Sequence, residues 1–232
     1  MAREALALEA AGARYLFIVD SVFNGDPAHS LAVAAAFQSV GVSIPWGAYF
    51  APLAPPPGFY DRMAAAGCTH VEFGTESLSD PVLQSIRKSF RRSEVFDAHR
   101  SARRAGLHVA HFLILGGPDE DERTLEDTLS AAEGLEDAAL FLFCGMRVYR
   151  GTELAAITRR AGQIADDDDL LRAVFYEPPA LRLSEIEDRV RARASGHRNW
   201  IVGDGDERTR HVTARLYAKG HTGPLWEHLV SA

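Results

Sequence analysis

Short apolar runs alternate with longer segments of helical periodicity along most of this chain, and this alternation is the strongest constraint on its fold. Extended segments, each followed by at least one helix, are predicted at residues 14–20, 44–50, 70–74, 108–115 and 139–148. Runs that are apolar throughout are typical of parallel strands that helices cover on both faces. The pattern predicts an α/β fold with about five parallel strands, in either a doubly wound sheet or a curved partial barrel.

Charge and targeting signals narrow the class of protein. The formal net charge of the 232 residues is -7, so no long basic face is available to follow a nucleic acid backbone. The N-terminus lacks a basic leader followed by an apolar core, and no apolar run approaches membrane-spanning length. We expect a cytoplasmic protein with no membrane span and no nucleic acid partner.

Cysteine and histidine usage argues against a metal site made by this chain. Cys68 and Cys144 are the only cysteines and lie far apart in sequence, which also argues against a disulfide framework. His108 and His111 flank one predicted strand and should point to opposite faces, while His70 begins another strand, so that no two converge. We therefore predict no metal ligands.

Candidate ligand-binding residues follow the predicted strands, because chemistry sits at the C-terminal ends of strands in both architectures. Glu76, in the Gly-Thr-Glu-Ser segment at residues 74–77, offers a carboxylate to ribose hydroxyls or to an ammonium group. Lys88 can pair with a ligand carboxylate. Gly116 and Gly117 end a strand and let the backbone approach a flat ligand such as a nucleobase, although such glycine pairs are also ordinary turns.

The order of the motifs resembles that of a known family. Asp-Ser-Val-Phe-Asn after one strand, Gly-Thr-Glu-Ser with a later lysine, Leu-Ile-Leu-Gly-Gly-Pro before an acidic helix start, and Arg-Val-Tyr-Arg-Gly-Thr-Glu-Leu after the last strand occur in turn. Together they resemble the radical S-adenosylmethionine (SAM) superfamily, in the branch usually fused to a cobalamin-binding domain. The resemblance runs from about residue 2 to residue 200. It implies a partial (β/α) barrel of radical SAM type, of which this chain holds the last five of six strands.

The resemblance implies roles for individual residues. Glu76 would contact the ribose or methionine part of SAM, and Lys88 its carboxylate. Core packing is an equal alternative for Met146, and a turn or capping role is an equal alternative for Asp20. The residues expected to bind SAM are Glu76, Ser77, Lys88, Gly116, Gly117, Pro118, Met146 and Tyr149, with Asp20 and Asn24 facing the substrate or the cluster.

One part of the family pattern is missing. Three cysteines in a tightly spaced loop hold the 4Fe-4S cluster of the family, and no Cys-x-x-x-Cys-x-x-Cys pattern occurs here. The resemblance thus implies a chain truncated before the first strand and the cluster loop, inactive alone, whose longer parent performs SAM-dependent radical chemistry on a small molecule. A cluster-free module that binds SAM or a nucleotide, and a structural partner of a complete radical SAM subunit, remain alternatives.

The chain changes character near residue 165. An acidic run at residues 166–169 precedes a charged helix at residues 184–194, for which Ser184 is the predicted N-cap, and a further helix and tail begin at residue 208. We expect a partial radical SAM barrel over residues 1–164 and a helical extension over residues 165–232 that packs on the barrel. An upstream cobalamin-binding domain would be a partner of this barrel.

Overall fold

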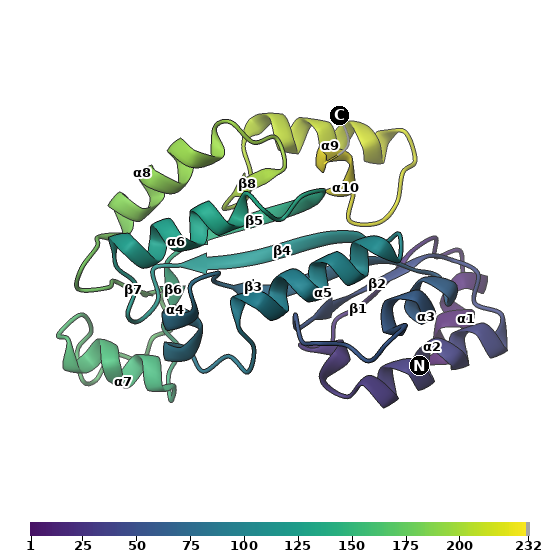
Figure 1. Ribbon diagram of the computed structural model, residues 1–232, viewed down its shortest axis with the longest axis horizontal. Helices are drawn as coiled ribbons and strands as arrows, with labels where there is room; N and C mark the ends of the chain where they lie inside the picture. Colours follow the sequence, from purple (N-terminus) through teal and green to yellow (C-terminus); the bar gives the residue numbers. More distant parts are fainter. Residues whose placement is uncertain (231–232) are drawn as a thin grey trace.

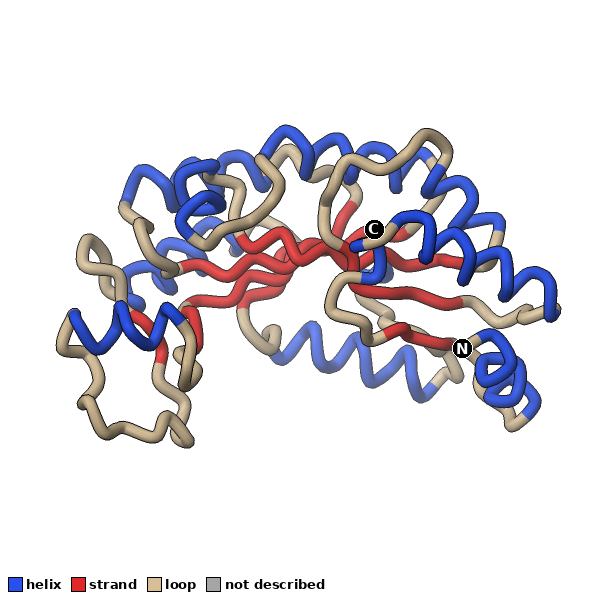
Figure 2. The backbone as a smooth tube through the Cα atoms, turned by 90° about the horizontal axis from the view of Figure 1, so that it is seen from below, coloured by secondary structure: helices blue, strands red, loops and turns tan. Residues whose placement is uncertain are grey.

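The computed structural model describes residues 1–230, and an open sheet of six parallel strands forms its centre (Figure 1, Figure 2). Residues 231 and 232, the end of the predicted extension, lie outside the described residues. The sheet order is β1-β2-β3-β4-β5-β8, so β1 and β8 are its edges. The strands are β1 Leu16–Ile18, β2 Trp46–Phe50, β3 Cys68–Glu76, β4 His108–Leu115, β5 Ala138–Cys144 and β8 Trp200–Val202. The predicted α/β class is confirmed, and β8 extends the five expected strands.

Most helices cover the outer face of this sheet, where their buried apolar side chains join those of the strands in one core. These helices are α1 Ala2–Ala10, α2 Pro27–Val40, α3 Phe59–Ala65, α5 Arg92–Arg104, α6 Glu122–Ala132 and α8 Leu183–Ala194. The remaining elements are η1 Phe23–Gly25, α4 Asp80–Ser85, β6 Met146–Arg147, α7 Glu153–Arg160, β7 Phe175–Tyr176, α9 Glu207–Ala218 and α10 Glu227–Val230. Within the described residues, none of these helices has the length and apolar character needed to cross a membrane.

The inner face of the sheet is the one that carries the side chains of Tyr49 and Glu72, which are register partners on β2 and β3. The C-terminal segment packs against this face, as the yellow segment of Figure 1 indicates. Trp226 joins a small apolar cluster there with Ala110 of β4 and Ala139 of β5. The end of the chain therefore fills part of the space that the curved sheet encloses.

Local sequence signals explain where α2 begins and ends. The carboxylate of Asp26 accepts hydrogen bonds from the backbone amides of Ala28 and His29, and Pro27 occupies the first helical position. The helix stops at Gly41, whose φ of 81° is left-handed. These three residues place the end of α2 so that Phe37 reaches the core beneath β2.

The structure corrects two expectations near the C-terminal half. The predicted strand over residues 139–148 is interrupted at Gly145, whose φ of 98° turns the chain out of the sheet. The residues after it form β6, which pairs with β7 in a separate antiparallel ribbon. The N-cap of α8 is Arg182 instead of Ser184, because the helix begins at Leu183, two residues earlier than an N-cap at Ser184 predicts.

Candidate functional site

Glu76 and Lys88 form an ion pair at the C-terminal end of β3. The Lys88 Nζ atom lies 2.9 Å from Glu76 Oε1, and the two side chains are 29% and 21% exposed. Glu76 has a φ of 63°, a left-handed conformation that is costly for a residue with a side chain. Such a conformation directs the carboxylate away from the strand path, so the predicted carboxylate and cation do meet in space.

Ser77 supports the turn that follows Glu76. Its hydroxyl lies 3.0 Å from the Thr128 hydroxyl of α6 and accepts a hydrogen bond from the backbone amide of Ser79. Thr128 also accepts from the amide of Leu78. Because Ser77 is fully buried, it holds the backbone beside Glu76 instead of projecting into open space.

A buried histidine pair lies directly behind this turn, and no pattern in the sequence predicts it. The Thr75 hydroxyl lies 2.7 Å from His111 Nδ1, and His111 Nε2 lies 3.1 Å from His99 Nδ1 on α5. Two further histidines, His70 and His108, stack with ring centroids 5.0 Å apart on the inner face. The expectation that no two histidines converge is therefore wrong.

The turn after β4 is built around a buried carboxylate. Glu120 accepts hydrogen bonds from the backbone amides of Gly116 and Gly117 through one oxygen, while its other oxygen has no partner among the described residues. Burial raises the pKa of this carboxyl. The carbonyl of Pro118 accepts from Ser85 of α4, which joins the turn to the loop that carries Lys88.

Protein atoms explain why both residues of this turn are glycine. A Cβ on Gly116 would lie 2.7 Å from Leu183 Cδ2, and its φ of 94° is left-handed. A Cβ on Gly117 would lie 3.2 Å from Met146 Cε. The glycines thus let α8 and the half-buried Met146 approach the backbone of the turn.

The remaining predicted residues differ widely in exposure. Tyr149 is 55% exposed. The Arg147 guanidinium lies over its ring in a cation–π contact, 4.9 Å from the ring centroid. Asp20 is exposed after β1. Asn24 is buried, and its side-chain amide donates to the carbonyl and accepts from the amide of Ala51, each at 2.8 Å. Asn24 therefore joins the segment after β1 to the end of β2.

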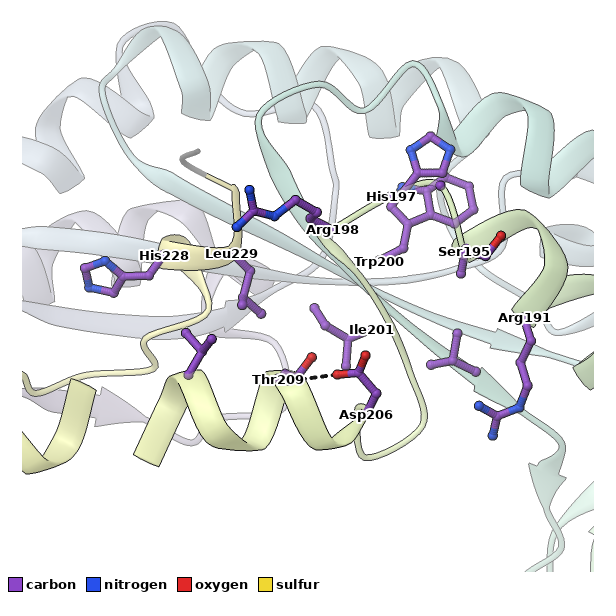
Figure 3. A pocket seen from close by; sticks show the side chains of 14 residues that line it. Arg191, Ser195, His197, Arg198, Trp200, Ile201, Asp206, Thr209, His228 and Leu229 are labelled. Atoms are coloured by element: carbon purple, nitrogen blue, oxygen red, sulfur yellow. Dashed lines mark hydrogen bonds between the residues drawn. The ribbon is translucent and has the colours of Figure 1, made fainter. Parts of the chain in front are cut away.

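A separate cavity of about 300 Å³ lies between α8, β8, α9 and α10, on the far edge of the sheet (Figure 3). His197 stacks on Trp200 with ring centroids 4.5 Å apart. The carboxylate of Asp206 caps α9 by accepting from the amide of Thr209, the bond drawn in Figure 3. None of the predicted site residues lines this cavity.

The sequence profile of the Radical SAM superfamily matches residues 2–132, which span α1 to the end of α6. The chain belongs to the radical SAM superfamily. This match includes the Glu76–Lys88 pair and the glycine turn, whereas β6 and the segment with Tyr149 lie outside it.

Two curated proteins are similar in sequence to part of this chain. The chain is 29% identical over 148 residues to an uncharacterized methyltransferase of Pyrococcus horikoshii, with 62% of this chain and 31% of that protein covered. It is 33% identical over 131 residues to the heme chaperone HemW of Mycobacterium tuberculosis, with 55% of this chain and 33% of that protein covered. The chain thus spans about a third of the length of these relatives.

Solved structures extend the radical SAM likeness to nearly the whole chain. The methyltransferase TsrM from Kitasatospora setae, with cobalamin and a [4Fe-4S] cluster bound, has a TM-score of 0.81 at 18% identity and matches 98% of this chain and 52% of its own. The cobalamin-dependent SAM radical enzyme OxsB has a TM-score of 0.64 at 10% identity, with 96% and 39% covered. At these identities the likeness shows a shared fold.

The radical SAM cluster does not fit the residues present. Within residues 1–230, no group of three histidine, cysteine or acidic side chains could hold a metal ion. Cys68 is buried in β3, and burial raises the pKa of its thiol. Burial also raises the pKa of Cys144 to about 11. Both thiols favour the protonated form, whereas a cluster ligand must be a thiolate.

Proposed function

We propose that this chain binds the amino acid part of SAM at the Glu76–Lys88 pair. An α-amino acid carries an ammonium and a carboxylate on one carbon, and the pair offers a carboxylate and an ammonium 2.9 Å apart. The ammonium of such a ligand can pair with the Glu76 carboxylate, and its carboxylate can pair with the Lys88 ammonium. Each contact is then a charge-assisted hydrogen bond. This preformed, half-buried pair is the observation that carries the proposal.

The adenosine part of SAM would lie along the turn after β4. Gly116, Gly117 and Pro118 would form its wall, Met146 would supply an apolar surface, and Tyr149 an exposed ring. Ser77 would act by holding the backbone next to Glu76. Asp20 and Asn24, in the segment after β1, would lie on the substrate side. In the superfamily, bound SAM is the source of the radical that attacks the substrate.

We propose that the cluster is supplied by chain outside these residues. The edge of β1 is the natural place for it, because within the described residues β1 pairs with β2 on one side only. An unpaired parallel edge presents backbone donors and acceptors to an incoming strand. A strand carrying the three-cysteine loop, from a longer form of the protein or from a partner subunit, would bring the cluster next to Glu76 and restore SAM-dependent radical chemistry, with a cobalamin-binding domain as a further partner.

Calorimetric titration of the purified chain with S-adenosylhomocysteine, without iron, tests the SAM site. We expect saturable binding that Lys88→Ala and Glu76→Gln each weaken about tenfold, since each removes one charge-assisted contact. Arg87→Ala is the matched control, because Arg87 pairs with Glu153 at the surface. Binding that is unchanged in the Lys88 and Glu76 variants would reject this site.

Anaerobic reconstitution with iron and sulfide tests the cluster separately. We expect the desalted chain to retain no cluster and to leave SAM uncleaved. Binding without iron together with no cluster would also fit a cluster-free module, and adding a cysteine-loop polypeptide distinguishes the two: gain of SAM cleavage supports the radical enzyme. Retention of about four irons per chain would overturn the proposal.

A further inference from the structure

A cavity of about 480 Å³ lies on the inner face of the sheet, between β1 to β3 and the segment that leads to α10. The sheet contributes Tyr15, Phe17, Tyr49 and Glu72, and the C-terminal side contributes Tyr217. One exposed cation, Arg14, also lines it. The cavity is thus walled by aromatic rings and contains one acidic side chain.

Glu72 is the unusual member of this lining. Glu72 is only 6% exposed. The Trp226 indole N–H donates a hydrogen bond to Glu72 Oε1 at 2.8 Å. No hydrogen bond to Oε2 is found among the described residues, and Glu72 faces the cavity. Burial raises the pKa of this carboxyl. A desolvated carboxylate with one open oxygen gains most from a cationic donor.

The aromatic side chains around Glu72 suit a flat, cationic ligand. Phe17 and Tyr49 meet edge to face with ring centroids 4.8 Å apart. Tyr49 and Tyr217 remain 38% and 54% exposed, so their rings are free to contact a ligand. Aromatic faces attract both planar rings and ammonium groups.

We propose that this cavity binds an arylalkylamine, with the ammonium on Glu72 Oε2 and the aromatic ring among Phe17, Tyr49 and Tyr217. The indole of Trp226 positions the carboxylate by holding its other oxygen.

Contacts around the cavity hold residues 223–227 in place beside it. Glu227, next to Trp226, lies 3.2 Å from His70 on β3. Gly223, with a φ of 104°, lets the backbone pass close to the Tyr15 ring, 3.3 Å from where a Cβ would lie. Because these contacts anchor residues 223–227 to the sheet, the cavity exists before any ligand binds.

The position of the cavity relates it to the proposed SAM site. Glu72 and Gly74 are two apart on β3 and face the same side of the sheet. The register with β4 shifts between Gly74 and Glu76, but Glu76 Oε1 lies 3.8 Å from where a Cβ on Gly74 would stand, so its carboxylate reaches this side as well. That the arylalkylamine is the substrate of radical chemistry rests on the proposed function. Amine binding itself does not, and it is therefore measured without SAM.

Calorimetric titration with three ligands of similar shape tests the charge preference: phenethylamine, phenethyl alcohol and phenylpropionate. We expect phenethylamine to bind at least about tenfold more tightly than the alcohol, and phenylpropionate not to bind. Equal affinity for amine and alcohol would overturn the proposal. Tighter binding of phenylpropionate would also overturn it and make Arg14 the recognising group.

Variants test the assignment of the residues. Glu72→Gln should weaken phenethylamine binding about tenfold and leave that of phenethyl alcohol unchanged. Trp226→Phe keeps an aromatic ring at this position but removes the N–H that donates to Glu72, and it should weaken the binding of the amine only. Glu122→Gln, at an exposed carboxylate paired with Arg189, is the control. If Glu72→Gln does not fold, Tyr49→Leu, at a partly exposed ring, replaces it, and unchanged amine affinity there would reject the site.

Lys88→Ala separates this site from the proposed function. This variant should bind S-adenosylhomocysteine about tenfold more weakly and bind phenethylamine as the parent chain does. If the chain does not bind S-adenosylhomocysteine but still prefers the amine, only the proposed SAM site is rejected. If it binds S-adenosylhomocysteine but shows no preference for the amine, only the amine site is rejected.

Discussion

His111 on β4 hydrogen-bonds to His99 on α5 through facing ring nitrogens 3.1 Å apart, and neither residue reaches solvent to any useful extent. The Glu136 carbonyl accepts from His99, so a neutral His99 must accept from His111 Nε2–H, and His111 Nδ1 must accept from the Thr75 hydroxyl. This directed chain requires both rings to be neutral. It holds Thr75, and through it the strained backbone of Glu76.

Stability should fall on acidification because of this pair. Burial lowers the pKa of His99 to about 4 and holds that of His111 well below its usual value. Between the ordinary histidine pKa and about pH 4, the unfolded chain binds protons that the folded chain does not, so stability is lost as pH falls through this window. For His99 alone, the free energy of unfolding should fall by about 3 kcal/mol across this window.

Urea unfolding at several pH values measures this loss. His99→Gln should flatten the pH dependence, and His29→Gln, at an exposed histidine of α2, should leave it as in the parent chain. A free energy of unfolding that does not change over this range would contradict the neutral pair.

Replacing Asn24 by alanine should destabilise the junction between η1 and β2. The substitution removes both hydrogen bonds to Ala51 and leaves a part-buried amide and carbonyl without partners, at a cost of about 1 to 3 kcal/mol. Asn24→Asp keeps the acceptor but places a buried carboxylate oxygen against the Ala51 carbonyl, so its loss at neutral pH should be at least as large as that of the alanine variant. Denaturant unfolding gives both values, and an unchanged alanine variant would show that this junction contributes nothing.

Gly47→Ala should reveal how closely Tyr15 packs on β2. An added Cβ would overlap the Tyr15 hydroxyl and lie 3.0 Å from His70 Cβ, and such overpacking costs about 1 to 3 kcal/mol. Tyr15→Phe removes the hydroxyl and should restore part of the lost stability in the double variant. Additive losses in a thermal double-mutant cycle would contradict the contact.

Glu120→Ala should loosen the glycine turn after β4. Two backbone amides lose their acceptor inside the protein, which costs about 1 to 3 kcal/mol. Glu120→Gln retains a neutral acceptor and avoids a buried charge, so it should be at least as stable as the parent. Hydrogen exchange at Gly116 and Gly117 reports the turn directly, and equal protection in both variants would exclude this role.

The strands that carry the fold were predictable because they are long and apolar. The expected segments 44–50 and 108–115 contain β2 and β4, since parallel strands covered on both faces leave a continuous apolar signal. β8 has only three residues, too few for any periodicity. After the break at Gly145, β6 pairs with β7, which lies about thirty residues further along the chain. No periodic pattern in the sequence signals this pairing.

The candidate site was predictable only in part. Glu76 and Lys88 are polar residues after a strand end, and the order of motifs pointed to them. The roles of His99 and Glu72 depend on which helix and which segment pack on each face of the sheet, and neighbouring residues in the sequence carry no signal of that. Trp226 reaches Glu72 across 154 positions of the chain.

The pairing of β5 with β8 has a consequence for how the protein is made. During synthesis β5 is complete at Cys144, but its outer edge finds its partner only once residues 200–202 have left the ribosome. Until then the nascent sheet exposes the edge of an almost wholly apolar strand, the kind of surface that other chains can capture. Ribosomal pausing within residues 145–199 would lengthen this exposure, so we expect slower translation of this region to lower the yield of folded protein.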